Sequence, residues 1–208
     1  MPTDLVVCVA TEFEGLLLRP HLPVLVTGVG AVNAAISLTR FLERGGAAGV
    51  ISCGIGGAYP GAGLPLETAV WAESECYGDL GAASSSGFLD MRALGFPVIA
   101  GPEPLYNRLP VAIQPNGRAK KPFVTVNTCT GDEAGAIAVE ARTGGGVESM
   151  EGAAIAHVAA LYGIPMGEVR GISNRVGIRD RSAWRVKEAA AAAQEALLDA
   201  WRRGELRP

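Results

Sequence analysis

Continuous apolar runs separated by helix-like segments make up the first third of the chain. Residues 5–10, 24–27 and 49–52 are apolar almost throughout, and residues 66–74 are mostly apolar. Runs of this length are typical of strands that are covered on both faces. The segment after the second run favours a helix that ends near Arg44. Strands that alternate with helices in this way predict an α/β fold.

The second half of the chain shows fewer long patterns. Prolines break residues 91–121 into short pieces, and we expect no long element there. Residues 123–127 alternate in a way that predicts a strand, and Asp132 is expected to cap a helix that follows it. A short buried strand is expected at 168–173. The alanine-rich segment from about 183 to 203 predicts a helix with one apolar side.

Composition narrows the class of protein. The chain has 208 residues, of which 49% are hydrophobic and 19% charged, so we expect one compact domain over residues 1–208. A net charge of −3 gives no reason to expect nucleic acid or an anionic membrane as a partner. No segment is apolar for long enough to cross a bilayer, and the first four residues lack a basic leader pattern. We therefore expect a cytoplasmic protein.

The residues also offer little material for a metal site. The four cysteines are widely spaced without a C-x-x-C pair, and there are only two histidines. Structural zinc sites are normally built from clusters of these two residue types. We expect neither a metal nor an organic cofactor.

Glycine-rich stretches follow two of the predicted strands. Gly28-Val29-Gly30 lies between a strand and a helix, as in sites that bind a phosphate or a dinucleotide. The third glycine of that pattern is replaced by Asn33, and tight packing of strand and helix explains the glycines equally well. For residues 53–58 a tight turn is the favoured interpretation. Residues 77–87 are small and polar, which predicts a mobile loop.

Acidic and amide side chains stand near the ends of other predicted strands. Glu12 and Glu14 follow the first strand, at a place where open α/β sheets bind ligands, although acids also favour the first turn of a solvated helix. Glu151 is expected at the start of a helix. Asn174 directly follows the strand at 168–173, so Glu151 and Asn174 are expected near one edge of the sheet.

Four of these motifs together resemble the nucleoside phosphorylase/nucleosidase superfamily. They are Gly28-Val29-Gly30, the glycine run at 53–57, Met150-Glu151-Gly152 and Ile172-Ser173-Asn174. The stretches 77–81 and 179–184 resemble the futalosine hydrolases in particular, which are nucleosidases of an alternative menaquinone pathway. The resemblance implies a three-layer α/β fold with a central twisted mixed sheet between helices. It also implies a homo-oligomer, commonly a dimer, that acts on a small purine nucleoside.

The resemblance also implies roles for residues of this chain. Glu151 would bind the ribose 2′-hydroxyl, with Met150 packed against the sugar, and Ser149 would also bind substrate. Ile55 and Gly56 would lie next to the sugar or the attacking water. Between the two early acids, the motif of the superfamily selects Glu14 over Glu12 as the base that deprotonates water. Asn174 would face the purine.

The type of residue at 174 bears on the leaving group. Adenine-specific nucleosidases carry aspartate there, which can protonate N7 of adenine. An asparagine can instead donate to O6 of a 6-oxopurine while it accepts from N7–H. The residue therefore favours hypoxanthine or guanine as the departing base, although Asn also ends strands for purely structural reasons.

The nucleophile and the 5′ group are the remaining choices. Phosphorylases of the superfamily place an arginine just before the glycine run, where this chain has residues 51–53 without one. We therefore expect hydrolysis of futalosine with release of hypoxanthine. Arg179 or Arg181 could bind the carboxylate of the 5′ substituent, although pairing with Asp180 explains both. The alternatives are a methylthioadenosine/S-adenosylhomocysteine nucleosidase, a 6-oxopurine nucleoside phosphorylase, or a non-catalytic NAD- or nucleotide-binding module.

Overall fold

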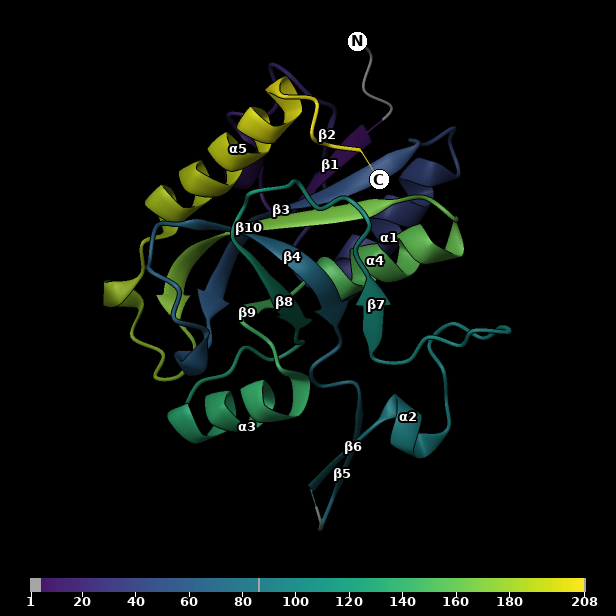
Figure 1. Ribbon diagram of the computed structural model, residues 1–208, viewed down its shortest axis with the longest axis vertical. Helices are drawn as coiled ribbons and strands as arrows, with labels where there is room; N and C mark the ends of the chain where they lie inside the picture. Colours follow the sequence, from purple (N-terminus) through teal and green to yellow (C-terminus); the bar gives the residue numbers. More distant parts are fainter. Residues whose placement is uncertain (1–4, 86, 208) are drawn as a thin grey trace.

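A mixed β-sheet with helices on both faces forms the body of the protein in the computed structural model, which describes residues 5–85 and 87–207 (Figure 1). The first four residues, on which the expectation about a leader rests, lie outside this description. In chain order the elements are β1 Leu5–Val9, η1 Glu12–Gly15, β2 Val24–Val26, α1 Ala31–Leu42, β3 Gly49–Ala58, η2 Pro60–Ala62, β4 Ala69–Cys76, β5 Gly81–Ser84, β6 Gly87–Asp90, α2 Met91–Leu94, β7 Arg108–Pro110, β8 Lys120–Thr125, α3 Glu133–Thr143, β9 Val147–Ser149, α4 Gly152–Leu161, β10 Met166–Arg175, η3 Arg181–Ala183 and α5 Val186–Arg202.

The sheet contains both parallel and antiparallel neighbours. Its strand order is β10-β4-β8-β9-β3-β1-β2, with β7 paired to β4. Strand β3 runs parallel to β1 and β10 but antiparallel to β9. Because β3 pairs with β10 as well as with β9, the sheet curls back on itself. The predicted mixed α/β architecture is confirmed.

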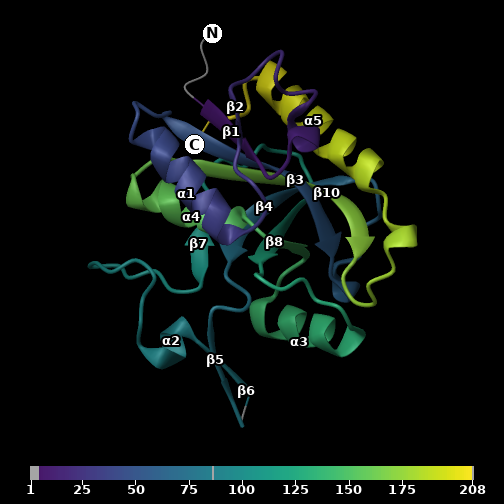
Figure 2. The ribbon, with the colours of Figure 1, turned by 180° about the vertical axis from the view of Figure 1, so that it is seen from behind.

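Alternate side chains of β1 show how the sheet divides the core. Val6 and Cys8 pack in the cluster that contains α1 and α4, whereas Val7 and Val9 pack in the cluster that contains α5. Figures 1 and 2 show α5 on one face of the sheet and α1 with α4 on the other. The alternation follows from the pleat of a strand, because successive side chains point to opposite faces. Burial of each such apolar side chain contributes about 2 kcal/mol.

The helix boundaries follow local chemistry. Asp132 accepts a hydrogen bond from the Gly135 backbone N–H at 2.7 Å, which confirms it as the cap of α3. Helix α4 begins directly after Glu151, as the sequence predicts. In the described part of the chain, no helix is long and apolar enough to pass through a membrane.

The glycine run at 53–58 is a strand, and the interpretation as a tight turn is wrong. These residues form the second half of β3 and pair with residues 169–175 of β10. The glycines are needed because other side chains lie against the strand. A Cβ added at Gly54 would lie 2.6 Å from Glu14 Oε1 and 2.7 Å from Arg170 Nη1. Glycine at position 54 allows the buried Glu14 carboxylate and the buried Arg170 guanidinium to lie close to the strand.

The segment expected as a mobile loop forms an antiparallel hairpin instead. Strands β5 and β6 pair from Gly81 and Asp90 to Ser84 and Gly87, and the hairpin projects from the body of the molecule (Figure 2). Small polar residues mask a strand pattern because they provide no apolar alternation. The proline-rich segment that follows contains only the short elements α2 and β7, so the expectation of no long element there is confirmed.

Candidate active site

A pocket of about 260 Å³ opens at the carboxyl ends of β1, β3 and β10. The three residues expected to be catalytic and the four expected to bind substrate all line it, although they come from four separate segments of the chain. They are Glu14, Ile55, Gly56, Ser149, Met150, Glu151 and Asn174. Strand carboxyl ends are where α/β proteins commonly bind ligands, because loops and helix starts converge there.

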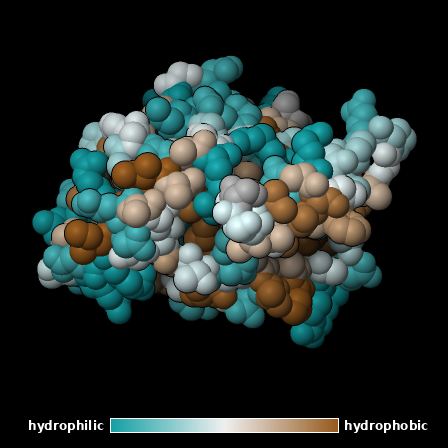
Figure 3. Space-filling view, turned by 90° about the horizontal axis from the view of Figure 1, so that it is seen from below, coloured by the Kyte–Doolittle hydropathy of each residue, from teal (hydrophilic) through white to brown (hydrophobic). Residues whose placement is uncertain are grey.

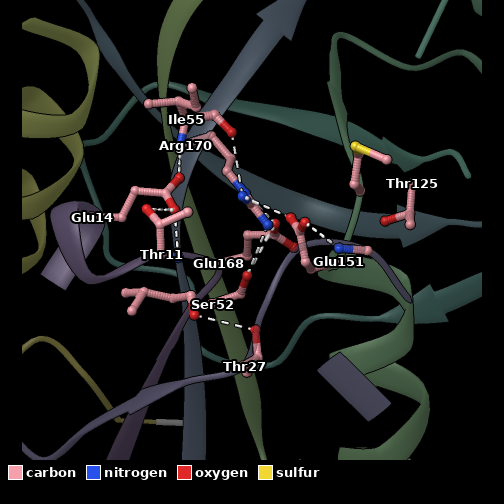
Figure 4. A network of polar contacts seen from close by, with 12 residues as sticks. Thr11, Glu14, Thr27, Ser52, Ile55, Thr125, Glu151, Glu168 and Arg170 are labelled. Carbon is pink, nitrogen blue, oxygen red and sulfur yellow. Dashed lines mark hydrogen bonds and ion pairs between the residues drawn. The ribbon is translucent and has the colours of Figure 1, made fainter. Parts of the chain in front are cut away.

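Glu14 lies in the pocket and Glu12 does not. The Glu14 side chain accepts hydrogen bonds from the backbone N–H of Ile55 at 3.0 Å and of Thr11 at 3.0 Å, and from the Thr11 hydroxyl at 2.9 Å (Figure 4). Glu12 is exposed and pairs with Arg19 at the surface. The short helix η1 turns the two acids apart, so only Glu14 can meet a bound ligand.

Glu151 occupies the N-cap position of α4 but makes no capping hydrogen bond to its own helix. Its Oε1 instead accepts from the backbone N–H of Gly30 at 2.9 Å, and its Oε2 lies 3.4 Å from Arg170 Nη1 (Figure 4). Stabilisation of the helix end therefore does not explain this buried acid. Gly30 has φ of 95° and Gly28 of 86°, so glycine is required in this turn.

The Gly28–Gly30 turn gives no support to the dinucleotide interpretation. The backbone N–H of Gly30, which would have to donate to a phosphate oxygen, already donates to the Glu151 carboxylate. A phosphate at this place would meet a negative charge, which disfavours its binding. The turn holds the Glu151 carboxylate in position instead.

Arg170 is the central residue that the sequence analysis missed. It is buried on β10 and donates to Glu168 at 2.7 Å, to the Ser52 hydroxyl at 3.1 Å and to the Ile55 carbonyl at 3.2 Å. Burial alone would lower the pKa of Arg170, but the nearby carboxylates, Glu168 first, raise it above its usual value. The signal was present in the sequence. Glu168 and Arg170 are two residues apart in an apolar strand, which puts both on one face.

Asn174 lies inside β10, one residue before its end, next to an irregularity in the pairing with β3. Its Oδ1 accepts from the Ser173 hydroxyl at 2.7 Å, and its Nδ2 donates to the Arg175 carbonyl at 3.0 Å. These two bonds orient the amide. One N–H and one acceptor lone pair of the amide remain for a ligand.

Ser149 and Met150 lead from β9 into α4 and border the pocket. The buried Ser149 hydroxyl has no hydrogen-bond partner within the described residues. Met150 Sδ lies 3.4 Å from Cys129 Sγ. An unpaired buried hydroxyl beside a thioether suits a ligand that has both polar and apolar parts.

The outer part of the pocket is mostly apolar. Phe13, Val29, Ile178 and Trp184 contribute to it, and Arg179 lies over the Trp184 ring with 5.2 Å between its Cζ and the ring centroid. The sequence marked Arg179 only as one of two candidates for a carboxylate. In the structure, Arg179 lines the pocket.

Comparison with known proteins identifies the family. The family model described as phosphorylase superfamily matches residues 13–202. The chain belongs to the phosphorylase superfamily. It is 36% identical to the futalosine hydrolase of Streptomyces coelicolor, over 86% of this chain and 80% of that protein. It is 34% identical to the futalosine hydrolase of Thermus thermophilus, over 83% of this chain and 78% of that protein.

A solved nucleosidase structure shows the same fold. The 5′-methylthioadenosine/S-adenosylhomocysteine nucleosidase of Neisseria meningitidis, solved with methylthio-immucillin-A, aligns with a TM-score of 0.78 at 19% identity. The match covers 96% of this chain and 98% of that one. At this identity the likeness shows the fold alone. The superfamily relationship predicted from the four motifs is confirmed.

Proposed function

We propose that this protein hydrolyses the N-glycosidic bond of a 6-oxopurine nucleoside, with futalosine as substrate and hypoxanthine as the released base. Two futalosine hydrolases are relatives at about a third identity over most of the chain, which supports this choice. The observation that carries the chemistry is that Glu14 and Glu151 line one pocket. A further proposal is that the protein acts in the cytoplasm.

The two carboxylates have separate roles in this reaction. As the glycosidic bond breaks, positive charge develops on the sugar and negative charge on the base. A carboxylate at Glu151 bonded to the 2′-hydroxyl binds the charged sugar more tightly than the neutral one, which lowers the barrier. Glu14 accepts a proton from water as the water oxygen forms its bond to the anomeric carbon. The electrons of the broken bond leave with the base, which takes a proton from solvent at N7.

Asn174 selects the base. Its remaining N–H donates to O6 of hypoxanthine, and its free lone pair accepts from N7–H. Adenine carries an amino group at position 6, so its amino N–H and the Asn174 N–H, both donors, would face each other. A mismatch of this kind at a buried site commonly reduces catalytic efficiency by orders of magnitude.

Hydrolysis is favoured over phosphorolysis by the charges in the pocket. Arg170 is the buried cation at the site, and its guanidinium is already bonded to Glu168, Ser52 and the Ile55 carbonyl. The Glu14 carboxylate occupies the space beside it. A phosphate beside Arg170 would meet the Glu14 carboxylate at close range, whereas water can donate to that carboxylate.

Arg179 is our candidate for the acidic 5′ group of the substrate. It lines the pocket and is oriented by the Trp184 ring rather than by an acid. Its guanidinium can therefore donate to a carboxylate in a bidentate manner. Arg179→Gln should raise KM for futalosine without changing turnover of inosine, which has no acidic 5′ group. An equal effect on both nucleosides would contradict this role.

We also propose that the protein is a homodimer. Val32 and Ile36, one helical turn apart on α1, are 69% and 53% exposed, and Val29 at the pocket is 52% exposed. Several separate apolar groups are visible on the face seen in Figure 3. The proposed partner is a second copy that covers α1 and shields the pocket mouth from water. Light scattering should give a dimer mass that Val32→Glu with Ile36→Glu reduces, whereas Ile137→Glu, an exposed control on α3, should not.

Base release tests the proposed function directly. Purified protein is incubated with futalosine, inosine and methylthioadenosine, each with and without phosphate, and the free base is identified by chromatography. We expect hypoxanthine from futalosine at a rate that phosphate does not change. Dependence on phosphate, or a preference for methylthioadenosine, would replace this proposal by one of the alternatives.

A further inference from the structure

Behind Arg170 lies a pair of buried acids that the proposed mechanism does not use. Glu75 on β4 and Glu168 on β10 are both completely buried. Glu75 Oε2 accepts from the Cys76 backbone N–H at 2.9 Å and from the Thr125 hydroxyl at 3.1 Å. Glu168 Oε1 accepts from Arg170 at 2.7 Å. One oxygen of each acid is therefore accounted for.

The other two oxygens meet at the start of α4. Among the described residues, neither Glu75 Oε1 nor Glu168 Oε2 has a hydrogen-bond donor. Both lie against Gly152, so close that a Cβ there would overlap them, and only glycine leaves them room. Two buried carboxylate oxygens cannot share a site as bare acceptors, because their charges repel and both lack a donor. A single proton between them satisfies both.

The surroundings decide which acid holds that proton. Glu168 faces the guanidinium of Arg170 and forms an ion pair with it. Glu75 faces only neutral donors, the Cys76 N–H and the Thr125 hydroxyl. Burial, and then the neighbouring Glu168, raises the pKa of Glu75 well above its ordinary value. The proton therefore belongs to Glu75.

We propose that neutral Glu75 and charged Glu168 are positioning residues for the active site. Glu75 donates a hydrogen bond to Glu168, and Glu168 holds Arg170 in place. This inference rests on the proposed function, because its purpose is to keep Glu151 available to substrate. Arg170 is closer to Glu168, at 2.7 Å, than to Glu151, at 3.4 Å. Without Glu168, Arg170 would be free to tighten its existing pair with Glu151 and so compete with the ribose hydroxyl.

The charge balance of the buried site supports the same assignment. With Glu75 neutral, Glu14, Glu151 and Glu168 face one arginine, which leaves the site negative and suited to a cationic transition state. An ionised Glu75 would add a fourth carboxylate near Arg170 without adding a second cation. The groups that act on Glu75 are Glu168 and Arg170 on β10 and the Cys76 N–H on β4, while Glu75 in turn acts on the Tyr77 hydroxyl.

Three glutamine variants test the proposal. Glu75→Gln replaces a neutral acid by a neutral amide that still donates to Glu168, so kcat should stay within about threefold of wild type. Glu168→Gln removes the charge that holds Arg170, so kcat should fall about 10- to 100-fold with a smaller change in KM. Glu73→Gln, an exposed acid on the same strand, is the matched control.

An infrared measurement tests the proton itself without reference to activity. Wild-type protein at neutral pH should show the carbonyl band of one protonated carboxylic acid, and Glu75→Gln should lack it. This measurement and Glu75→Gln need no folded Glu168 variant. Absence of the band, or loss of folding or kcat in Glu75→Gln, would overturn the proposal. If the band is present but no nucleoside is cleaved, the proposed function fails, and with it the positioning role, while the shared proton stands.

Discussion

Glu12 and Glu14 are two residues apart, yet one is solvent-exposed and the other is buried in the pocket. The Glu12 side chain is 71% exposed and pairs with Arg19, whereas Glu14 is 6% exposed and receives three hydrogen bonds from Thr11 and Ile55. The turn of η1 produces this separation. The two acids therefore form a matched pair for mutagenesis, since each has the same chemistry and only one can reach a ligand.

Glu14→Gln should reduce kcat by about 10²- to 10⁴-fold, because the amide cannot accept a proton from water. Binding of substrate should change much less, since the amide keeps the shape of the carboxylate. Glu12→Gln should leave both constants unchanged. The measurement is steady-state base release from futalosine. Equal losses in the two variants would show that the proton acceptor is elsewhere.

Asn174→Asp should shift the choice of base from 6-oxopurine toward adenine. The Ser173 hydroxyl can still donate to the new carboxylate, so the fold should be kept. A carboxylate repels O6 and accepts from the adenine amino group. We expect the ratio of kcat/KM for adenosine to that for inosine to rise by about 100-fold. The two nucleosides share one sugar, so an unchanged ratio would mean that Asn174 does not contact the base.

The shared proton of Glu75 makes stability fall as pH rises. The unfolded chain loses this proton near pH 4.3, the ordinary value for Glu, whereas burial and Glu168 keep it bound in the folded chain to a higher pH. The stabilisation is complete below that ordinary pKa and is lost progressively as pH rises toward the raised pKa of the folded state. In this interval the wild-type free energy of unfolding should fall by about 1.4 kcal/mol per pH unit relative to Glu75→Gln.

Urea unfolding of both proteins across the pH range measures this difference. Subtraction removes the other titrating groups, which the two proteins share. Parallel curves would mean that Glu75 keeps its ordinary pKa in the folded protein and is therefore ionised at neutral pH.

Much of the fold and the candidate site could be predicted from local patterns. Continuous apolar runs marked the central strands, and Asp132 marked a helix start, because these signals depend on neighbouring residues only. Glu14, Glu151 and Asn174 were selected by motif, and the structure brings them to one pocket. Their catalytic roles stay predictions.

The parts that were missed depend on contacts distant in sequence. The glycines of β3 make room for Glu14 and Arg170, and a local reading cannot distinguish that from a turn. Arg170 was hidden inside an apolar strand although Glu168 stood on the same face. Glu75 gave no sequence signal, because its partner lies on another strand. A buried charge in a strand should prompt a search for its partner.

Gly152→Ala should destabilise the protein, although alanine normally favours helices over glycine by about 1 kcal/mol. A Cβ at this first residue of α4 would lie 2.6 Å from Glu168 Oε1 and closer still to Glu75 Oε1, with both acids fixed by their own hydrogen bonds. We expect a loss of about 1–3 kcal/mol in urea unfolding. Gly131→Ala is the control, since a Cβ there meets no atom within 4 Å. Because Glu151 directly precedes Gly152, kcat should fall as well. If Gly152→Ala kept full stability, Glu75 and Glu168 would have to move apart at no cost in free energy. A proton shared between the two acids does not allow this.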